Sequence, residues 1–168
     1  LYNHVISIGF QCFRGSEDDV LDRYIQAAKS YKADIVVRIT GDCPLVDSKL
    51  LDEMYKEFLK RDYDYLTNGN PPTFPDGLDI EIFKFKILEQ SAQNDKSNYN
   101  KEHVTAYIRN SGLYKNGNFS TKNLGIKEDF SKFRFTVDEK IDLDVIKEIF
   151  DYFSPKLYFS WIDVIKYV

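Results

Sequence analysis

Apolar residues recur along this chain in two spacings, and each spacing predicts a different element. Residues 35–40 read Ile-Val-Val-Arg-Ile-Thr, a nearly continuous β-branched run that predicts a parallel strand covered on both faces. Apolar positions three and four residues apart instead predict helices with one buried face. We expect helices near residues 1–8, 17–28, 48–60, 86–93, 101–109, 141–153 and 161–168, and further strands near residues 10–13, 63–67, 78–83, 121–124 and 133–137.

Short polar residues stand where three of these helices are expected to begin. Ser16, Asp47 and Ser160 each precede a helical pattern, and such side chains cap the free N–H groups of a helix start. Residues 68–77 hold three of the five prolines and predict a stiff loop, and a second loop is expected at residues 111–118. The alternation of strands and helices predicts a single α/β domain over residues 1–168 with a mostly parallel sheet.

Composition narrows the classes of function. The 168 residues are 43% hydrophobic and 30% charged, which argues against a disordered chain, and the net charge of −4 disfavours nucleic acid as a partner. Small anions stay compatible, because a bound divalent cation can supply positive charge. No apolar run has the length of a membrane span, and no secretory signal opens the sequence. The two cysteines fit neither a disulfide framework nor a zinc motif, so we expect reduced thiols in a cytoplasmic protein.

Two acidic residues follow predicted strands at the ends where α/β sheets bind ligands. Asp42 follows the strand at 35–40, and Asp138 follows the strand at 133–137. Carboxylates from separate strands can converge on one cation, and Mg²⁺ suits a pair of carboxylates completed by water and phosphate. The alternative is that each Asp only caps the loop or helix that follows it. From these residues alone, both interpretations stay open.

Further candidates come from one strand and one helix. Asp79 and Glu81 alternate with apolar neighbours, so both carboxylates are expected on one face of a strand, where a metal or sugar hydroxyls would relieve their repulsion. A solvent-facing edge strand is the alternative. Glu102 and His103 open the predicted helix at 101–109, but a single histidine is more often a capping or packing residue than a catalyst.

Five segments of the sequence, taken in their order along the chain, resemble a known family. The sequence is similar to the cytidylyltransferase family of spore coat polysaccharide biosynthesis protein F, whose wider relatives include the CMP-sialate and CMP-3-deoxy-manno-octulosonate synthetases. The resemblance runs from about Phe13 to the C-terminus. It is carried by five segments, residues 14–24 (RGSEDDVLDRY), 37–47 (VRITGDCPLVD), 75–83 (PDGLDIEIF), 102–105 (EHVT) and 133–138 (FRFTVD).

The resemblance implies a Rossmann-like nucleotide-diphospho-sugar transferase fold and a reaction of CTP with a small sugar that releases pyrophosphate. The implied cofactor is Mg²⁺, and family members are often dimers, so a homodimer is also expected. By the same resemblance Asp42 and Asp138 are the catalytic metal ligands. The implied nucleotide-pocket residues are Arg14, Gly15 and Ser16, and the implied sugar-binding residues are Asp79, Glu81, Glu102 and His103.

The sequence departs from the family pattern at its start. Members begin with a strand and a basic, glycine-containing loop that grips the CTP phosphates, and the sequence from Leu1 shows neither. We therefore expect an N-terminally truncated domain that is inactive by itself if nothing replaces that unit. Two other functions stay open at this point. One is a glycosyltransferase of related fold, and the other is a non-catalytic sugar-binding or assembly module in a polysaccharide pathway.

Overall fold

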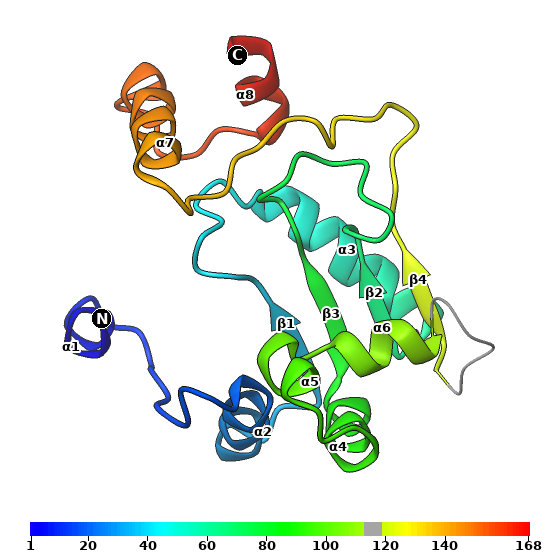
Figure 1. Cartoon of the computed structure of the whole chain (residues 1–168). Helices are drawn as coiled ribbons and strands as arrows, with labels where there is room; N and C mark the ends of the chain where they lie inside the picture. The colour runs from blue at the N-terminus through cyan, green and yellow to red at the C-terminus, as the bar shows by residue number, and fades with distance from the viewer. Residues whose placement is uncertain (113–118) are drawn as a thin grey trace. The chain divides into compact units, whose positions relative to one another are not determined.

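The computed structural model describes residues 1–112 and 119–168 (Figure 1). Helices are interspersed among the strands along the chain, and the expected α/β class is confirmed. The described residues form a mixed sheet of four strands in the order β1-β3-β2-β4. The strands are β1 (Ile35–Arg38), β2 (Tyr65–Thr67), β3 (Glu81–Lys84) and β4 (Thr121–Asn123). Within the described residues, no helix has both the length and the apolar character needed to cross a membrane.

Two expected strands do not form. Residues 10–13 are irregular, and Phe10 is 67% exposed, so this apolar segment has no buried face against which a strand could pack. Residues 133–137 make only an isolated parallel bridge, between Arg134 and Asp76. Their backbone forms hydrogen bonds with single residues of two loops and not with a strand. The alternating apolar residues therefore do not form part of a β-sheet here.

The chain divides into two compact units, residues 1–36 with 83–121 and residues 37–82 with 122–168. The expectation of a single domain stays a prediction. The first unit contains α1 (Tyr2–Ser7), α2 (Val20–Ser30), α4 (Phe85–Asn94), α5 (Asn98–His103) and α6 (Ala106–Gly112). The second contains α3 (Ser48–Arg61), α7 (Lys140–Phe153) and α8 (Trp161–Tyr167). Residues 113–118, part of the loop expected at 111–118, lie outside the described residues.

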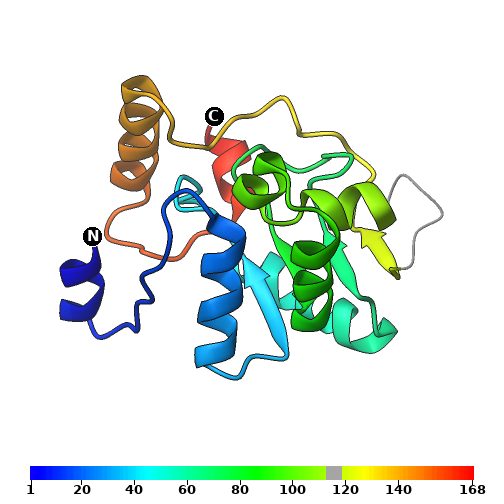
Figure 2. The same ribbon diagram turned by 60° about the horizontal axis from the view of Figure 1, so that its bottom comes forward.

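In the first unit, α2 packs against α4 and α5 (Figure 2). The buried face of α2 is the predicted apolar stripe, with Leu21 and Ile25 both less than 9% exposed. The helix begins later than expected, because Asp19 is the N-cap and accepts a hydrogen bond from the Asp22 N–H at 2.9 Å. Ser16 instead accepts from the Asp19 N–H at 3.0 Å. The predicted Ser16 cap is therefore wrong by one turn.

The single helix expected at 101–109 is two helices, α5 and α6. Val104 separates them with φ 61° and ψ −56°, a γ-turn in which the Thr105 N–H donates to the His103 carbonyl at 2.6 Å. The buried Asn100 side chain accepts a hydrogen bond from the Tyr107 N–H at 3.0 Å, so it satisfies a donor in the first turn of α6. This cap depends on a tertiary contact of a side chain, so the spacing of apolar residues could not predict the break between α5 and α6.

In the second unit, the Asp47 carboxylate joins two helix starts. One oxygen accepts from the Lys49 and Leu50 N–H groups at 2.8 and 3.2 Å, which confirms the predicted cap of α3. The other oxygen accepts from the Trp161 N–H at 3.0 Å, in the first turn of α8. Ser160 caps α8 as predicted, accepting from the Asp163 N–H at 3.1 Å.

The Asn68 side chain also forms two hydrogen bonds with backbone groups, here between β2 and β3. Its amide nitrogen donates to the Leu78 carbonyl and its amide oxygen accepts from the Ile80 N–H, both at 2.8 Å. The side chain is 1% exposed. It supplies the hydrogen-bond partners that the backbone of a longer neighbouring strand would offer to residues 78–80. This arrangement fixes the path of the chain immediately before Glu81, where β3 begins.

We expect Asp47→Ala to lower the free energy of unfolding by about 2 kcal/mol, because it removes the cap of α3 and the acceptor of the Trp161 N–H. Asp47→Asn keeps one acceptor oxygen and should cost about half as much. Urea denaturation followed by circular dichroism measures both values. Asp52→Ala, at an exposed position of α3, is the matched control. Equal stability of Asp47→Ala and this control would contradict the assigned role.

Candidate active site

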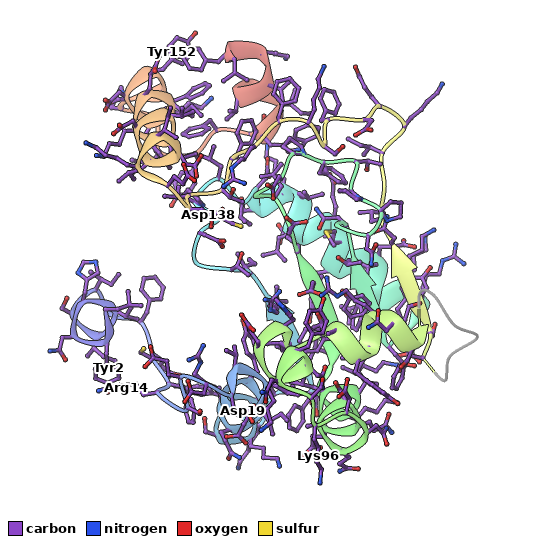
Figure 3. All side chains as sticks on the ribbon, viewed as in Figure 1. Tyr2, Arg14, Asp19, Lys96, Asp138 and Tyr152 are labelled. Carbon is purple, nitrogen blue, oxygen red and sulfur yellow. The ribbon has the colours of Figure 1, made fainter. Side chains whose placement is uncertain are left out.

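Two backbone hydrogen bonds bring three acidic segments of the second unit together. The Val137 N–H donates to the Asp42 carbonyl at 2.8 Å, and the Phe135 N–H donates to the Asp76 carbonyl at 2.7 Å. Asp138 directly follows Val137, so it lies next to the loop that follows β1 (Figure 3). The expected proximity of Asp42 and Asp138 is thus present in the backbone, although residues 133–137 form no strand.

Gly77 allows the close approach of these segments. Its φ is +97°, and a Cβ placed there would lie 2.7 Å from the backbone carbon of Phe135 and 2.8 Å from the Thr136 nitrogen. Any side chain at this position would therefore meet rigid backbone, and its left-handed conformation would add strain. Residues 76–77 thus position residues 135–138 against the Asp42 loop.

The Asp42 carboxyl is held as a carboxylate. Hydrogen bonding from Thr40 is the main cause that lowers its pKa, and the Cys43 thiol and the positive charge of Arg38 act in the same direction. The Cys43 sulfur lies 3.0 Å from the Thr40 hydroxyl and 3.5 Å from Asp42 Oδ1. Burial raises the pKa of the Cys43 thiol to about 11, so this cysteine stays protonated near neutral pH and is a poor nucleophile.

Asp138 is exposed, and its charge is balanced by Arg134. Arg134 Nη2 lies 2.6 Å from Asp138 Oδ2 and 3.2 Å from Asp142 Oδ2, and Nη1 lies 3.8 Å from Asp76 Oδ2. Asp142 also accepts from the Asp138 and Glu139 N–H groups at the start of α7. The Arg134 hydrogen bond, followed by these two backbone donors, lowers the pKa of Asp142 to about 2. A cation that binds Asp138 must share it with Arg134 or displace the guanidinium.

Asp79 and Glu81 lie in different surroundings. Glu81 is 6% exposed and accepts hydrogen bonds from the Tyr65 hydroxyl and from Arg38, both at 2.5 Å. Asp79 precedes β3 and is only partly buried. Burial is the main cause that raises its pKa, and the charges of Asp76, Glu81 and Asp42 act in the same direction. The missing side chain of Gly69 makes room for Asp79, because a Cβ there would lie 2.5 Å from Asp79 Oδ1.

The remaining predicted site residues belong to the first unit. The Arg14 guanidinium lies over the Tyr2 ring, 5.6 Å from its centroid (Figure 3). Arg14 and Gly15 line an open cavity of about 740 Å³. The Arg23 side chain packs against Gly15, 3.1 Å from where a Cβ would lie, and its guanidinium donates to the Ser16 carbonyl at 3.0 Å. This arrangement orders the loop to which the family resemblance gives a nucleotide-binding role, and that role stays a prediction.

Glu102 and His103 end α5, next to the γ-turn at Val104. The His103 ring packs edge-on against Tyr99, with 4.3 Å between ring centroids. Glu102 is exposed and His103 is partly buried. The predicted sugar-binding roles of both residues stay predictions.

Sequence reasoning missed three residues that complete the acidic site. Arg38 pairs with Glu81 across 43 positions of the chain, and Arg134 balances Asp138. Thr136 is 7% exposed, and the described residues offer no hydrogen-bond partner to its hydroxyl oxygen. A signal was present in the sequence: each is a polar residue inside an otherwise apolar, strand-like run.

The side chains present fit Mg²⁺. The described residues contain no cluster of three or more His, Cys, Asp or Glu side chains arranged for a metal. Mg²⁺ does not require one, because it is commonly held by one or two carboxylates, with waters and substrate phosphates supplying the other oxygens. Asp42 and Asp138 would hold the ion, and the lowered pKa of Asp42 keeps that carboxylate ionised. The orphaned Thr136 hydroxyl adds an oxygen next to the two segments that carry them.

Comparisons with known proteins agree with the resemblance. The sequence model of the family described as cytidylyltransferase matches residues 3–159. The chain is 36% identical over 156 residues to spore coat polysaccharide biosynthesis protein SpsF of Bacillus subtilis, covering 88% of this chain and 60% of that protein. It is 46% identical over 110 residues to the uncharacterized protein MJ1063 of Methanocaldococcus jannaschii, covering 65% of this chain and 44% of that protein. The chain thus spans about half the length of these curated relatives.

A solved structure is similar over nearly the whole chain. The structure of a cytidylyltransferase from Leptospira borgpetersenii superposes with a TM-score of 0.91 and 37% sequence identity. The match covers 98% of this chain and 68% of that one. The family match over residues 3–159 and this structural similarity support the same conclusion. The chain belongs to the cytidylyltransferase family.

Proposed function

We propose that the chain is part of a nucleotidyltransferase that transfers the CMP group of CTP to a small sugar and releases pyrophosphate. Family membership supports the reaction class. The observation that carries the proposal is the Val137–Asp42 backbone hydrogen bond, which sets two carboxylate-bearing segments side by side. The name of the Bacillus subtilis relative supports a role in surface or spore-coat polysaccharide biosynthesis. We place the reaction in the cytoplasm and expect the protein to form a homodimer.

The proposed reaction is an in-line displacement. A sugar hydroxyl oxygen attacks the α-phosphorus of CTP, the bond from that phosphorus to the bridging oxygen breaks, and pyrophosphate leaves with the electron pair. The hydroxyl proton passes to a carboxylate or to water. Bound Mg²⁺ would supply charge neutralisation on the phosphates. The protein contributes mainly by positioning the two reactants.

Each group of side chains then has a separate task. Asp42 and Asp138 would hold the metal, and Arg134 orients Asp138 until the ion shares it or displaces the guanidinium. Arg14, Gly15 and Ser16 line the nucleotide pocket in a loop ordered by Arg23.

The proposed sugar contacts differ in kind. Asp79 accepts a hydrogen bond from a sugar hydroxyl, since it is only partly buried. Glu81 is a positioning residue, because its carboxylate is engaged by Tyr65 and Arg38. For Glu102 and His103, in the first unit, the proposed sugar-binding role rests on the family resemblance alone.

In the whole protein of which the chain is part, Asp42→Asn should reduce Mg²⁺-dependent pyrophosphate release from CTP and sugar on the order of a hundredfold or more, because a neutral amide binds Mg²⁺ weakly. Asp52→Asn, on an exposed face of α3, is the control that should keep the wild-type rate. An unchanged rate in Asp42→Asn would overturn the assignment. Turnover of a nucleotide-sugar donor would instead indicate a glycosyltransferase, and sugar binding without metal-dependent CTP binding would indicate a non-catalytic module.

Asp79→Asn should raise the KM for the sugar about tenfold and leave the KM for CTP near its wild-type value, as for loss of one charged hydrogen bond. The carboxylate form exists above the pKa of Asp79, which lies above its ordinary 3.8, and is lost as the pH falls through that value. The wild-type sugar KM should therefore rise on acidification, whereas that of Asp79→Asn should stay flat. Steady-state kinetics across pH measure this. Parallel pH profiles for the two proteins would contradict the role.

A further inference from the structure

Thr136 carries a buried hydroxyl that the rest of the described protein leaves without a hydrogen-bond partner. The residue is 7% exposed. A buried hydroxyl that makes no hydrogen bond destabilises a folded protein, because it has lost its contacts with water and gained no partner in exchange. A valine of nearly the same shape would fill the same space without that cost. The hydroxyl therefore destabilises the fold, and no described contact offsets this effect.

The backbone of Thr136 is fixed within the acidic site. Its two neighbours, Phe135 and Val137, donate N–H groups to the Asp76 and Asp42 carbonyls. Its own nitrogen lies against Gly77, 2.8 Å from where a Cβ would be. Thr136 thus stands in the short segment that links the Asp76 loop to the Asp42 loop, two residues before Asp138.

The pattern along this segment places Thr136 with the charged residues. In an extended segment, side chains alternate between two faces, so positions 134, 136 and 138 share a face opposite Phe135. Arg134 and Asp138 are joined at 2.6 Å, which agrees with a shared face. Phe135 is 3% exposed and belongs to the core. Of the three polar residues on this face, Thr136 is therefore the buried one, and Arg134 and Asp138 are exposed.

We propose that the Thr136 hydroxyl contacts the ligand at the Asp42–Asp138 site, donating a hydrogen bond to an oxygen of the bound metal–nucleotide complex. This inference rests on the proposed function. The acceptor is an oxygen in either case, and it has two possible sources: a water in the hydration shell of the metal, or a phosphate oxygen of the nucleotide. Thr136 then acts as a contact residue that becomes satisfied only when ligand is bound.

Three variants of the chain test this. Thr136→Val removes the hydroxyl and keeps the shape, so the Tm without ligand should stay the same or rise. Its affinity for the ligand should fall about tenfold, as for loss of one hydrogen bond to a charged group. Thr136→Ser keeps the hydroxyl and should restore the affinity. Thr73→Val is the matched control, because the Thr73 hydroxyl accepts from the Ile126 N–H at 3.0 Å, so its Tm should fall while the affinity is unchanged.

Binding is measured in two arms, with Mn²⁺ alone by electron paramagnetic resonance and with CTP plus Mn²⁺ by calorimetry. Weaker binding of Thr136→Val in both arms assigns the acceptor to the metal hydration shell, and weaker binding only with CTP assigns it to the phosphate. Unchanged affinity in both arms, or a lower Tm of the unliganded Thr136→Val protein, overturns the inference alone. These measurements use the whole protein of which the chain is part. A wild-type protein that binds neither Mn²⁺ nor CTP overturns the proposed function, and the inference with it.

Discussion

The hydrogen bond from the Val137 N–H to the Asp42 carbonyl joins the loop that follows β1 to the segment that leads into α7. These segments are almost a hundred residues apart in the chain, and without this pairing Asp138 would have no fixed relation to Asp42. The parallel contact at Asp76 and the glycine at position 77 support the same alignment from the other side. The charge distribution of the second unit follows from this alignment. It brings several carboxylates together where only a few basic side chains can balance their charge.

Two arginines provide most of that balance, and they do so differently. Arg38 and Glu81 form an ion pair that is largely withdrawn from water and completed by the Tyr65 hydroxyl. Breaking a pair of this kind is costly, because either partner would be left as a buried charge. Arg134 is half exposed and serves several carboxylates at once, so each of its contacts is weakened by solvent and can be exchanged. One arginine thus forms a buried ion pair, and the other forms ion pairs that remain in contact with solvent.

Local features of the sequence were sufficient for much of the fold. The β-branched run at β1 and the caps at Asp47 and Ser160 depend on near neighbours, and the strand and both caps are confirmed. The expectation that this strand is covered on both faces is wrong, because β1 is an edge strand of the described sheet and Val37 is 38% exposed. The break between α5 and α6 was missed, because it depends on the buried Asn100 side chain meeting the Tyr107 N–H. The strand expected at 133–137 was wrong for a similar reason, since its partners are single residues of loops.

The candidate site shows the same limit. The placement of Asp42 and Asp138 could be anticipated, because both follow apolar runs. The polar positions of Arg38 and Thr136 within apolar runs were visible, but the partner of Arg38 and the lack of a partner for the Thr136 hydroxyl were not. Both depend on tertiary contacts, or on their absence among the described residues. The pKa directions of Asp42 and Asp79 likewise come from neighbours brought close by folding.

The position of Arg134 has a consequence for long-range electrostatics. A divalent cation that takes over Asp138 adds two positive charges and releases the guanidinium from its closest partner. The local field at this end of the second unit would then become less acidic, because the ion adds positive charge among the carboxylates while the guanidinium stays nearby. In a chain with a net charge of −4, a site that carries such an ion would repel an anionic ligand less than the same site without it.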